Sequence, residues 1–430
     1  MNSSIVIDIS HLASRVSVNP HTGIDRVDIA YARAISSLDA PHIVGLYRGL
    51  LGPIVVSRDD IRRIIKKVDD HVHQTAEFDQ SENLQELERW LTRSPNEQQK
   101  FSSRISSNVR AKASLKDRVT SHVGSLLKGK NSLQVPLNSI YLNVTPHGTP
   151  APKSFRWLNE RPDVKAVFFV HDLLPIDRPE LFPCSWLSGF EKMVSAVASH
   201  AAGIIVASEV MRLRVAAEMK KRGRPPIPIH VCALPPSFEY EGEARLAVTA
   251  SRPPYFVTCG TLEPRKNHLI LLNSWLDLIR EGGRIPRLVL VGKRGWKNQD
   301  VFDLLDSSVP LRGHVFEASG LSDVAASWLL HDSCGALVPS LDEGYGFPVV
   351  EAMSLGLPTV VSDIPIFREV SQGHAIFCNP LRQEQWLMAI RNLSDRTSEE
   401  WKRQAQRVSE FRSPTWPSYF GSVLSFLSDL

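Results

Sequence analysis

The sequence predicts an α/β protein made of two doubly wound units that face each other across a cleft. Three observations predict this fold class. The chain has 430 residues, more than one hydrophobic core usually supports. Short apolar runs alternate with helical patterns in two separate series, as they do in parallel sheets. A polar, proline-bearing stretch at about 241–254 separates the two series and is expected to be the linker.

The first unit is expected over residues 1–245. It opens with a strand, a helix and a second strand, and four further strands follow a long insertion at about 57–134. The expected strands are 5–9, 43–47, 139–144, 164–170, 203–207 and 229–232, and the first helix is expected at 24–38.

The second unit is expected over residues 250–412, followed by a separate helix within 413–430. Its expected strands are 255–259, 288–291, 335–338, 359–361 and 375–378. Pro414 and Pro417 break the chain before the last helix, because proline cannot continue a helix. The apolar stripe of that helix needs a partner, and comprises Phe420, Val423, Leu424, Phe426 and Leu427.

Composition excludes several classes of protein. No apolar run reaches the roughly 18 residues that span a bilayer, and the N-terminus enters a strand without a charged region or cleavage site, so export is not expected. Five scattered cysteines without metal-ligand spacing indicate core residues of a reduced, cytoplasmic protein. A formal net charge of only +4, without a recognised motif, argues against nucleic-acid binding.

The insertion contains a basic stretch with apolar residues at helical spacing. Residues 100–130 carry eight Lys or Arg against a single Asp. Such a helix could lie on an anionic membrane, where each basic residue contributes on the order of 1 kcal/mol. It could equally pack its apolar stripe on the first unit. The sequence leaves both alternatives open.

Two carboxylates eight positions apart, Glu343 and Glu351, flank a glycine turn. The run 335–339 predicts a buried strand, 344–346 a tight loop, and 347–355 a helix that tolerates Pro348 in its first turn. A ligand in this loop would meet backbone amides at the helix N-terminus. Both carboxylates could accept hydrogen bonds from hydroxyl groups. This chemistry suits a sugar nucleotide.

A pair of cations follows the first strand of the second unit. Arg265 and Lys266 come after the turn at Gly260 and Thr261 and are expected to open a helix at 267–279. A helix N-terminus adds its dipole to their charge. A departing diphosphate needs cations and amides of this kind when no metal is bound. These residues therefore predict a phosphate platform.

One histidine ends a buried strand of the first unit. His171 follows the run 166–170, at the carboxyl edge where open α/β sheets bind ligands. Asp172 could orient its ring, or could be an ordinary loop or cap residue. No pair of aspartates stands where a metal-dependent transferase would need one, since the adjacent pairs at 59–60 and 69–70 fall in the insertion.

Together these segments resemble the E-x7-E signature of the retaining nucleotide-sugar glycosyltransferases with the two-domain B-type fold, known as glycosyltransferase family 4 or group 1. The matching segments cover most of residues 165–380 in the family's order. Besides Glu343 and Glu351 they are 260–268, 288–292, 358–363 and the segment around His171. The resemblance implies two Rossmann-like domains, with the acceptor on the first and the donor on the second.

The resemblance also implies roles for single residues. Arg265 and Lys266 match the residues that bind the donor phosphates, Glu343 the one that bonds the sugar hydroxyls, and Glu351 the one that holds the ribose. His171 would face the donor sugar. The segment 22–26 resembles the family's first glycine loop, but offers a single glycine there. The expected catalytic residues are His171, Glu343, Arg265 and Lys266, and the expected donor-binding residues are Gly23, Gly260, Thr261, Arg265, Lys266, Gly344, Tyr345, Gly346, Phe347 and Glu351, with Arg26 a further contact.

The implied activity is retaining transfer of a sugar from a nucleoside diphosphate to a glycan or lipid-linked acceptor in surface polysaccharide biosynthesis. The segment 261–268 favours a mannosyl donor on guanosine diphosphate through its resemblance to polysaccharide mannosyltransferases. Neither a metal nor another cofactor is expected, and the protein is placed in the cytoplasm at the inner membrane face. An epimerase or phosphorylase of the same fold, or a non-catalytic sugar-nucleotide-binding protein, are the alternatives.

The resemblance further implies how the units move. The final helix is expected to cross back to the first unit, which makes the linker and the stretch 413–417 paired hinges. Donor binding to the second unit should then bring His171 and Gly23 towards Glu343.

Overall fold

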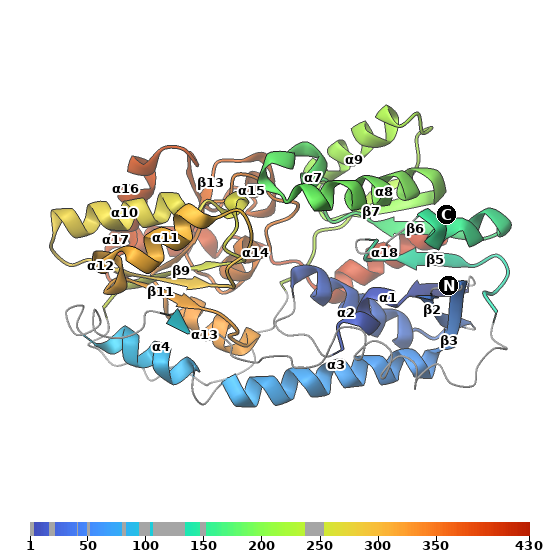
Figure 1. Ribbon diagram of the computed structural model, residues 1–430, viewed down its shortest axis with the longest axis horizontal. Coiled ribbons are helices and arrows are strands. Elements are labelled where there is room, and N and C mark those ends of the chain that lie inside the picture. Colours follow the sequence, from blue (N-terminus) through green and yellow to red (C-terminus); the bar gives the residue numbers. More distant parts are fainter. Residues whose placement is uncertain are drawn as a thin grey trace.

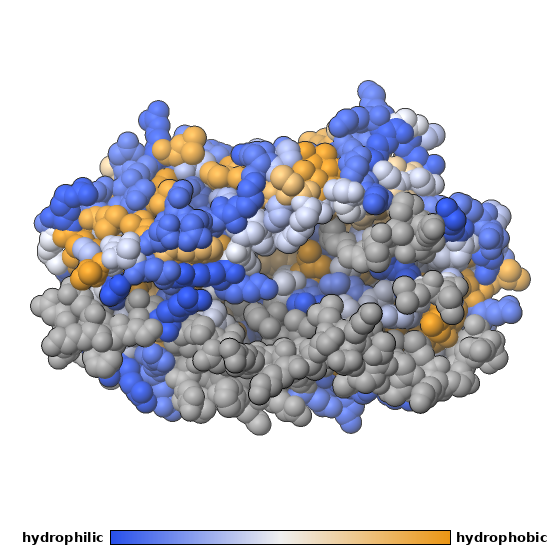
Figure 2. All heavy atoms as spheres, viewed as in Figure 1, coloured by the Kyte–Doolittle hydropathy of each residue, from blue (hydrophilic) through white to orange (hydrophobic). Residues whose placement is uncertain are grey.

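The protein forms two α/β units, each built on a largely parallel sheet (Figure 1). The computed structural model describes residues 4–16, 22–40, 42–49, 52–79, 83–93, 104–105, 134–146, 152–236 and 253–430. The predicted fold class is confirmed. The expected linker and nearly all of the basic stretch at 100–130 lie outside the described residues. In the space-filling view, the upper outline of the molecule dips between the two units (Figure 2).

The first sheet has seven strands in the described residues. In spatial order they are β3 (Gly52–Ser57), β2 (Ile43–Gly49), β1 (Ile5–Asp8), β5 (Ile140–Asn143), β6 (Lys165–Phe169), β7 (Ala201–Val206) and β8 (Ile229–Val231). All neighbours are parallel except β3, which pairs antiparallel to β2 at the edge. The sequence analysis did not predict β3, which ends where the expected insertion begins. The strand order reverses between β1 and β5, where doubly wound sheets bind ligands.

Helices cover the faces of this sheet (Figure 1). In the first unit these are α1 (Ser10–Ser14), α2 (Gly23–Ser37), α3 (Arg58–Asp79), α7 (Leu174–Asp177), α8 (Cys184–His200), α9 (Glu209–Lys221) and the 3-10 helices η1 (Pro152–Glu160) and η2 (Pro179–Leu181). Helix α2 begins one residue earlier than predicted, because Thr22 and Asp25 form a capping box.

The second sheet also has seven strands in the described residues, and its recorded pairings are all parallel. In order they are β14 (Ile376–Cys378), β13 (Thr359–Ser362), β12 (Gly335–Val338), β9 (Tyr255–Cys259), β10 (Arg287–Val291), β11 (Val315–Ala318) and β4 (Arg104–Ile105). Strand β11, which the sequence analysis did not predict, is short and carries Glu317 in its middle. The central strands are buried on both faces, as parallel strands between helices must be.

The helices of the second unit are α10 (His268–Glu281), α11 (Gln299–Ser307), α12 (Val309–Arg312), α13 (Asp323–Asp332), α14 (Phe347–Ser354), α15 (Pro365–Val370), α16 (Gln383–Leu393), α17 (Glu399–Val408) and the 3-10 helix η3 (Pro264–Lys266). Arg265 and Lys266 lie in η3, one short turn before the helix that they were predicted to open.

The insertion is divided between the two units, whereas the sequence analysis assigned all of it to the first. Helix α3 packs on the first unit through Ile61, Ile64 and Val68. Helix α4 (Asn83–Thr92) instead joins the core of the second unit, and β4 pairs with β11 at the sheet edge. Figure 1 shows α3 and α4 running along the same side of both units. The insertion therefore contacts both units.

A buried arginine holds the end of α4. Arg287, at the start of β10, donates through its guanidinium to the carbonyls of Trp90 and Arg93. Its guanidinium carbon also lies 4.9 Å from the centre of the Trp90 ring. A cation at a helix C-terminus donates hydrogen bonds to the last carbonyls and interacts favourably with the negative end of the helix dipole. Burial nevertheless lowers the pKa of Arg287 to about 10.

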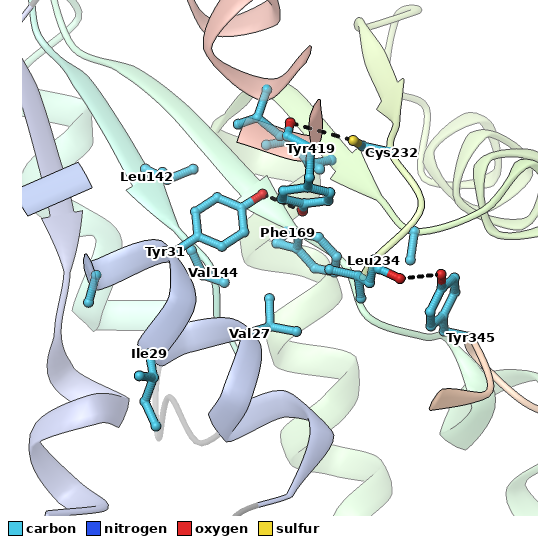
Figure 3. Packing of buried hydrophobic residues seen from close by; sticks show 14 of the residues in the cluster. Val27, Ile29, Tyr31, Leu142, Val144, Phe169, Cys232, Leu234, Tyr345 and Tyr419 are labelled. Atoms are coloured by element: carbon cyan, nitrogen blue, oxygen red, sulfur yellow. Dashed lines mark hydrogen bonds between the residues drawn. The ribbon is translucent and has the colours of Figure 1, made fainter. Parts of the chain in front are cut away.

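The last helix, α18 (Trp416–Asp429), packs on the first unit. Its residues Tyr419, Val423 and Leu427 are buried in the same cluster as Tyr31 of α2. The two tyrosine hydroxyls lie 2.7 Å apart (Figure 3). The helix begins before Pro417, because Thr415 caps it and proline is tolerated in a first turn.

Replacing Trp90 tests the docking of α4. Trp90 is 3% exposed and its ring centre lies 5.0 Å from that of Phe316. We expect Trp90→Ala to lower the free energy of unfolding by about 3–5 kcal/mol, the usual cost of such a cavity. Hydrogen exchange should accelerate in β10 and β11 while β1 to β3 stay protected. Leu213→Ala, at a 57% exposed position, is the control, and acceleration confined to the first unit would contradict the assignment.

Candidate active site

The predicted motifs meet at the carboxyl edge of the second sheet. Strand β9 leads into the turn at Gly260 and then into η3, and β12 leads into the loop before α14. Leu341 of that loop donates its backbone N–H to the carbonyl of Arg265 at 2.8 Å, which ties the two segments together. Side chains far apart in the sequence are thus brought into one cluster.

Glu343 is the centre of this cluster. Its carboxylate forms ion pairs with Arg265 and with Lys266, whose Nζ lies 2.6 Å from Oε1. The hydroxyl of Ser340 donates to the same oxygen at 2.9 Å. Burial alone would raise the pKa of Glu343, but the charges of Arg265 and Lys266 outweigh it and bring the pKa to about 2. Glu343 is therefore a buried, ionised hydrogen-bond acceptor.

The two cations are themselves held in place. Arg265 donates to Glu263 at 2.6 Å and to the backbone carbonyl of Asp342 at 3.1 Å. Both cationic side chains are mostly buried, at 14% and 12% exposed. Burial raises the pKa of Glu263 above its usual value, although Arg265 and Lys266 act in the opposite direction. The fold thus orders two cations at the edge of a buried loop.

Glycine is required where the backbone passes close to other groups. Gly260 has a φ of +139°, and a Cβ there would stand 3.1 Å from the Lys266 side chain. A Cβ on Gly344 would stand 2.6 Å from the carbonyl oxygen of His171. Gly346, with a φ of +107°, is the N-cap of α14. These contacts explain the glycine turn that the sequence shows.

His171 lies where β6 ends, against the loop that carries Glu343. Its Nε2 lies 2.8 Å from the carbonyl of Val144, so this nitrogen carries a hydrogen and donates it. The Asp172 carboxylate accepts a hydrogen bond from the backbone N–H of Leu174 at 3.2 Å, as in an Asx turn. This contact favours an ordinary loop residue over one that orients the ring of His171.

The first unit reaches the same loop through α2. A Cβ on Gly23 would stand 2.7 Å from the ring of Phe347, so the start of α2 contacts the start of α14. Tyr345 donates its hydroxyl to the carbonyl of Leu234 at 2.6 Å (Figure 3). Gly23 and His171 are therefore already beside the loop of Glu343, and the structure holds the two units together at this site.

Glu351 lies beside this cluster with a different partner. Arg26 reaches from α2 to place Nη1 3.2 Å from the Glu351 carboxylate, and its Nη2 contacts Asp323. Cys259 lies close to charges from both parts of the site. Burial raises the pKa of its thiol to about 12, and the charge of Glu351 raises it further. Arg26 and Lys266 act in the opposite direction. The sequence predicted Arg26 as a contact of the first unit, but not these carboxylate partners.

Other contacts between the units were not predicted. Arg214 of α9 pairs with Asp342 at 3.0 Å, 128 positions away. The Glu369 carboxylate accepts from the first two amides of α9, at 2.6 and 2.9 Å. Thr261, a predicted donor-binding residue, packs closely on Gly295. A Cβ added to Gly295 would lie 2.6 Å from the Thr261 methyl group. No local pattern signals a pair that forms only when the units meet.

Comparison with known proteins relates the second unit to a known family. Residues 245–408 match the family model described as glycosyl transferases group 1. It is 28% identical over 266 residues to the serotype-specific mannosyltransferase WbdA of Escherichia coli, a match covering 56% of this chain and 32% of WbdA. The O-antigen chain mannosyltransferase RfbU of Salmonella typhimurium is 46% identical over 66 residues, 15% of this chain and 19% of RfbU. The chain thus spans about a third of WbdA.

Solved structures share the fold. Sucrose-phosphate synthase from Thermosynechococcus elongatus aligns over 100% of both chains with a TM-score of 0.58 and 14% identity. Anabaena Alr3699/HepE in complex with UDP-glucose aligns over 68% of this chain and 79% of its own, with a TM-score of 0.54 and 17% identity. At these identities the likeness concerns the fold alone, and it supports two Rossmann-like domains.

The low pKa of Glu343 predicts a specific loss of stability in acid. Its folded pKa is about 2 against an ordinary value of 4.5, so its contribution is complete above pH 4.5 and is lost as the pH falls towards 2. The contribution is on the order of 3 kcal/mol. In urea unfolding, we expect wild type to be more stable than Glu343→Gln at pH 7, with the difference shrinking towards pH 3. Glu399→Gln, in an exposed pair with Lys402, should leave the curve unchanged. A difference that does not depend on pH would contradict the ionised state.

Proposed function

We propose that this protein is a retaining glycosyltransferase. It moves a sugar, with mannose the favoured one, from a nucleoside diphosphate to a glycan or lipid-linked acceptor in surface polysaccharide biosynthesis. The observation that carries the proposal is the convergence of Arg265 and Lys266 on Glu343 at the loop that begins α14. This arrangement combines phosphate-binding cations with an acceptor for sugar hydroxyls.

Each part of the cluster has a task in the proposed reaction. The diphosphate replaces the carboxylate as the partner of Arg265 and Lys266, and Glu343 turns to the hydroxyls of the donor sugar. The amides at the start of α14 add their dipole. As the glycosidic bond to the diphosphate breaks, negative charge grows on the leaving oxygens, where fixed cations stabilise it most. These groups supply the charge without a metal ion, and no cofactor is part of the proposal.

Retention follows from attack on the face that the diphosphate leaves. The acceptor hydroxyl forms the new bond to the anomeric carbon as the old bond to phosphate breaks, and a phosphate oxygen takes the proton of the hydroxyl. His171, beside Gly344, is proposed to shape the space around the donor sugar. Its Nε2 bond to Val144 fixes the ring, so a positioning task suits it better than proton transfer at that nitrogen.

The sugar and the process are inferred from the relatives. Those reported above are named for mannosyl transfer, and both names refer to serotype or O-antigen. Mannosyl transfer from guanosine diphosphate mannose is therefore the first reaction to test. The matches cover 32% of WbdA and 19% of RfbU, so the full activities of these relatives are not carried over to this chain.

Removing either cation should slow transfer. We expect Arg265→Ala and Lys266→Ala each to lower turnover by about 10²-fold or more, the size typical of losing a charge contact in the transition state. Turnover is measured with a panel of nucleotide sugars including guanosine diphosphate mannose, with and without glycan acceptors. Arg280→Ala, on the exposed face of α10, is the control. Near-normal turnover in both site variants would remove the phosphate platform.

The same panel separates the alternative functions. A transferase consumes the donor only with an acceptor and gives a product that keeps the anomeric configuration. An epimerase would change the donor alone, a phosphorylase would act on a polymer, and a binding protein would bind the nucleotide sugar without turnover. An inverted product would contradict retention while leaving transfer intact.

The proposed lipid-linked acceptor would lie in a membrane. No helix among the described residues is long and apolar enough to cross a bilayer. We propose that the basic stretch at 100–130 contacts an anionic membrane that carries a lipid-linked acceptor. Reversing several of its charges should reduce sedimentation with anionic vesicles and leave nucleotide binding intact. Vesicle binding that ignores both charge reversal and added salt would contradict this contact, because salt screens electrostatic attraction.

A further inference from the structure

Arg26 forms an ion-pair bridge that crosses from one unit to the other. It stands in the first turn of α2, next to the contact between Gly23 and Phe347. Its two terminal nitrogens contact carboxylates on two helices of the second unit, Glu351 on α14 and Asp323 at the start of α13. A guanidinium suits this task because its rigid fork presents several donors in fixed directions.

The two carboxylates that Arg26 contacts differ in burial. The Glu351 side chain is only 6% exposed, whereas that of Asp323 is 44% exposed. A buried carboxylate is costly without a compensating charge, and in its ionised form both of its oxygens act only as hydrogen-bond acceptors. The side chain of Arg26 is 22% exposed, and both carboxylates raise its pKa against the effect of burial. Arg26 thus supplies a permanent charge to a carboxylate of the other unit.

We propose that Arg26 is a positioning residue that sets Glu351 for the ribose hydroxyls of the donor, so that nucleotide recognition by the second unit depends on closure onto the first. This inference rests on the proposed function, in which Glu351 holds the ribose. Arg26 orients the carboxylate, and Asp323 holds the guanidinium in place. When the units separate, Glu351 loses that partner, and the preference for ribose hydroxyls declines with it.

The proposal differs from a merely structural bridge in one measurable respect. A structural bridge would stabilise the closed arrangement for every nucleotide equally. A residue that sets Glu351 alters the discrimination between a ribose and a deoxyribose. The readout is therefore the ratio of dissociation constants for guanosine diphosphate and its 2′-deoxy and 3′-deoxy analogues, measured by calorimetry on the full chain.

We expect wild type to prefer guanosine diphosphate over at least one deoxy analogue by about 10-fold or more, as for a hydroxyl bonded to a charged acceptor. Arg26→Ala should reduce this preference to about 3-fold or less. Arg26→Lys should restore it in part, because a single ammonium cannot bridge two carboxylates in the same way. Asp323→Asn should have a smaller effect than Arg26→Ala, since the contact with Glu351 remains.

Two further variants complete the test. Glu351→Gln should abolish the preference, and adding Arg26→Ala to it should change the ratio no further, because both act through one carboxylate. Arg33→Ala is the matched control, since Arg33 stands on the same helix and pairs with Asp69 within the first unit. It should leave every ratio unchanged.

The outcomes separate this inference from the proposed function. If wild type binds none of the guanosine or uridine diphosphates, the proposed function fails and the inference fails with it. If wild type discriminates and Arg26→Ala weakens all nucleotides by one common factor, Arg26 is only a structural bridge and the inference alone is overturned. A full preference in Arg26→Ala overturns it equally. Loss of the preference in Arg26→Ala and Glu351→Gln, but not in Arg33→Ala, supports it.

Discussion

The arrangement of the candidate site depends on one buried carboxylate and the two cations that hold it. Glu343 is 6% exposed, and its charge is tolerated there only because Arg265 and Lys266 compensate it. The pairing ties the end of β9 to the loop after β12. It also holds the two cations next to the N-terminus of α10. The cost of ordering them is met by folding, so a bound anion gains from groups already in position.

The contacts between the units gather around the same loop. Gly344 packs under His171, Phe347 lies against Gly23, and the hydroxyl of Tyr345 binds Leu234. Each uses a residue of the segment 344–347. Because the contacts between the units and the proposed donor site share this segment, we expect a change at the loop to act on both. The insertion adds a second connection, in which α3 belongs to one core and α4 to the other. The proposed motion between the units would therefore have to accommodate α4 and α18 as well as the expected linker.

Local patterns in the sequence predicted much of the fold and the identity of the clustered residues. The buried strands are apolar runs, and the glycine turn with Pro348 predicts the start of α14, because these features depend on neighbours in the chain. The meeting of Arg265, Lys266 and Glu343 follows from parallel strands whose carboxyl ends share an edge. The rest depends on distant pairs. Docking of α4 requires Arg287, 197 positions from Trp90, and the partners of Arg26 lie 297 and 325 positions away. No local signal encodes such pairs.

In the proposed reaction, the donor diphosphate takes the place of the Glu343 carboxylate beside Arg265 and Lys266. A crystal structure with a bound nucleoside-diphosphate sugar is the decisive measurement. We expect diphosphate oxygens at about 3 Å from Lys266 Nζ and from the Arg265 guanidinium, with Glu343 turned to a sugar hydroxyl. A diphosphate bound elsewhere, with Lys266 still 2.6 Å from Glu343, would contradict it.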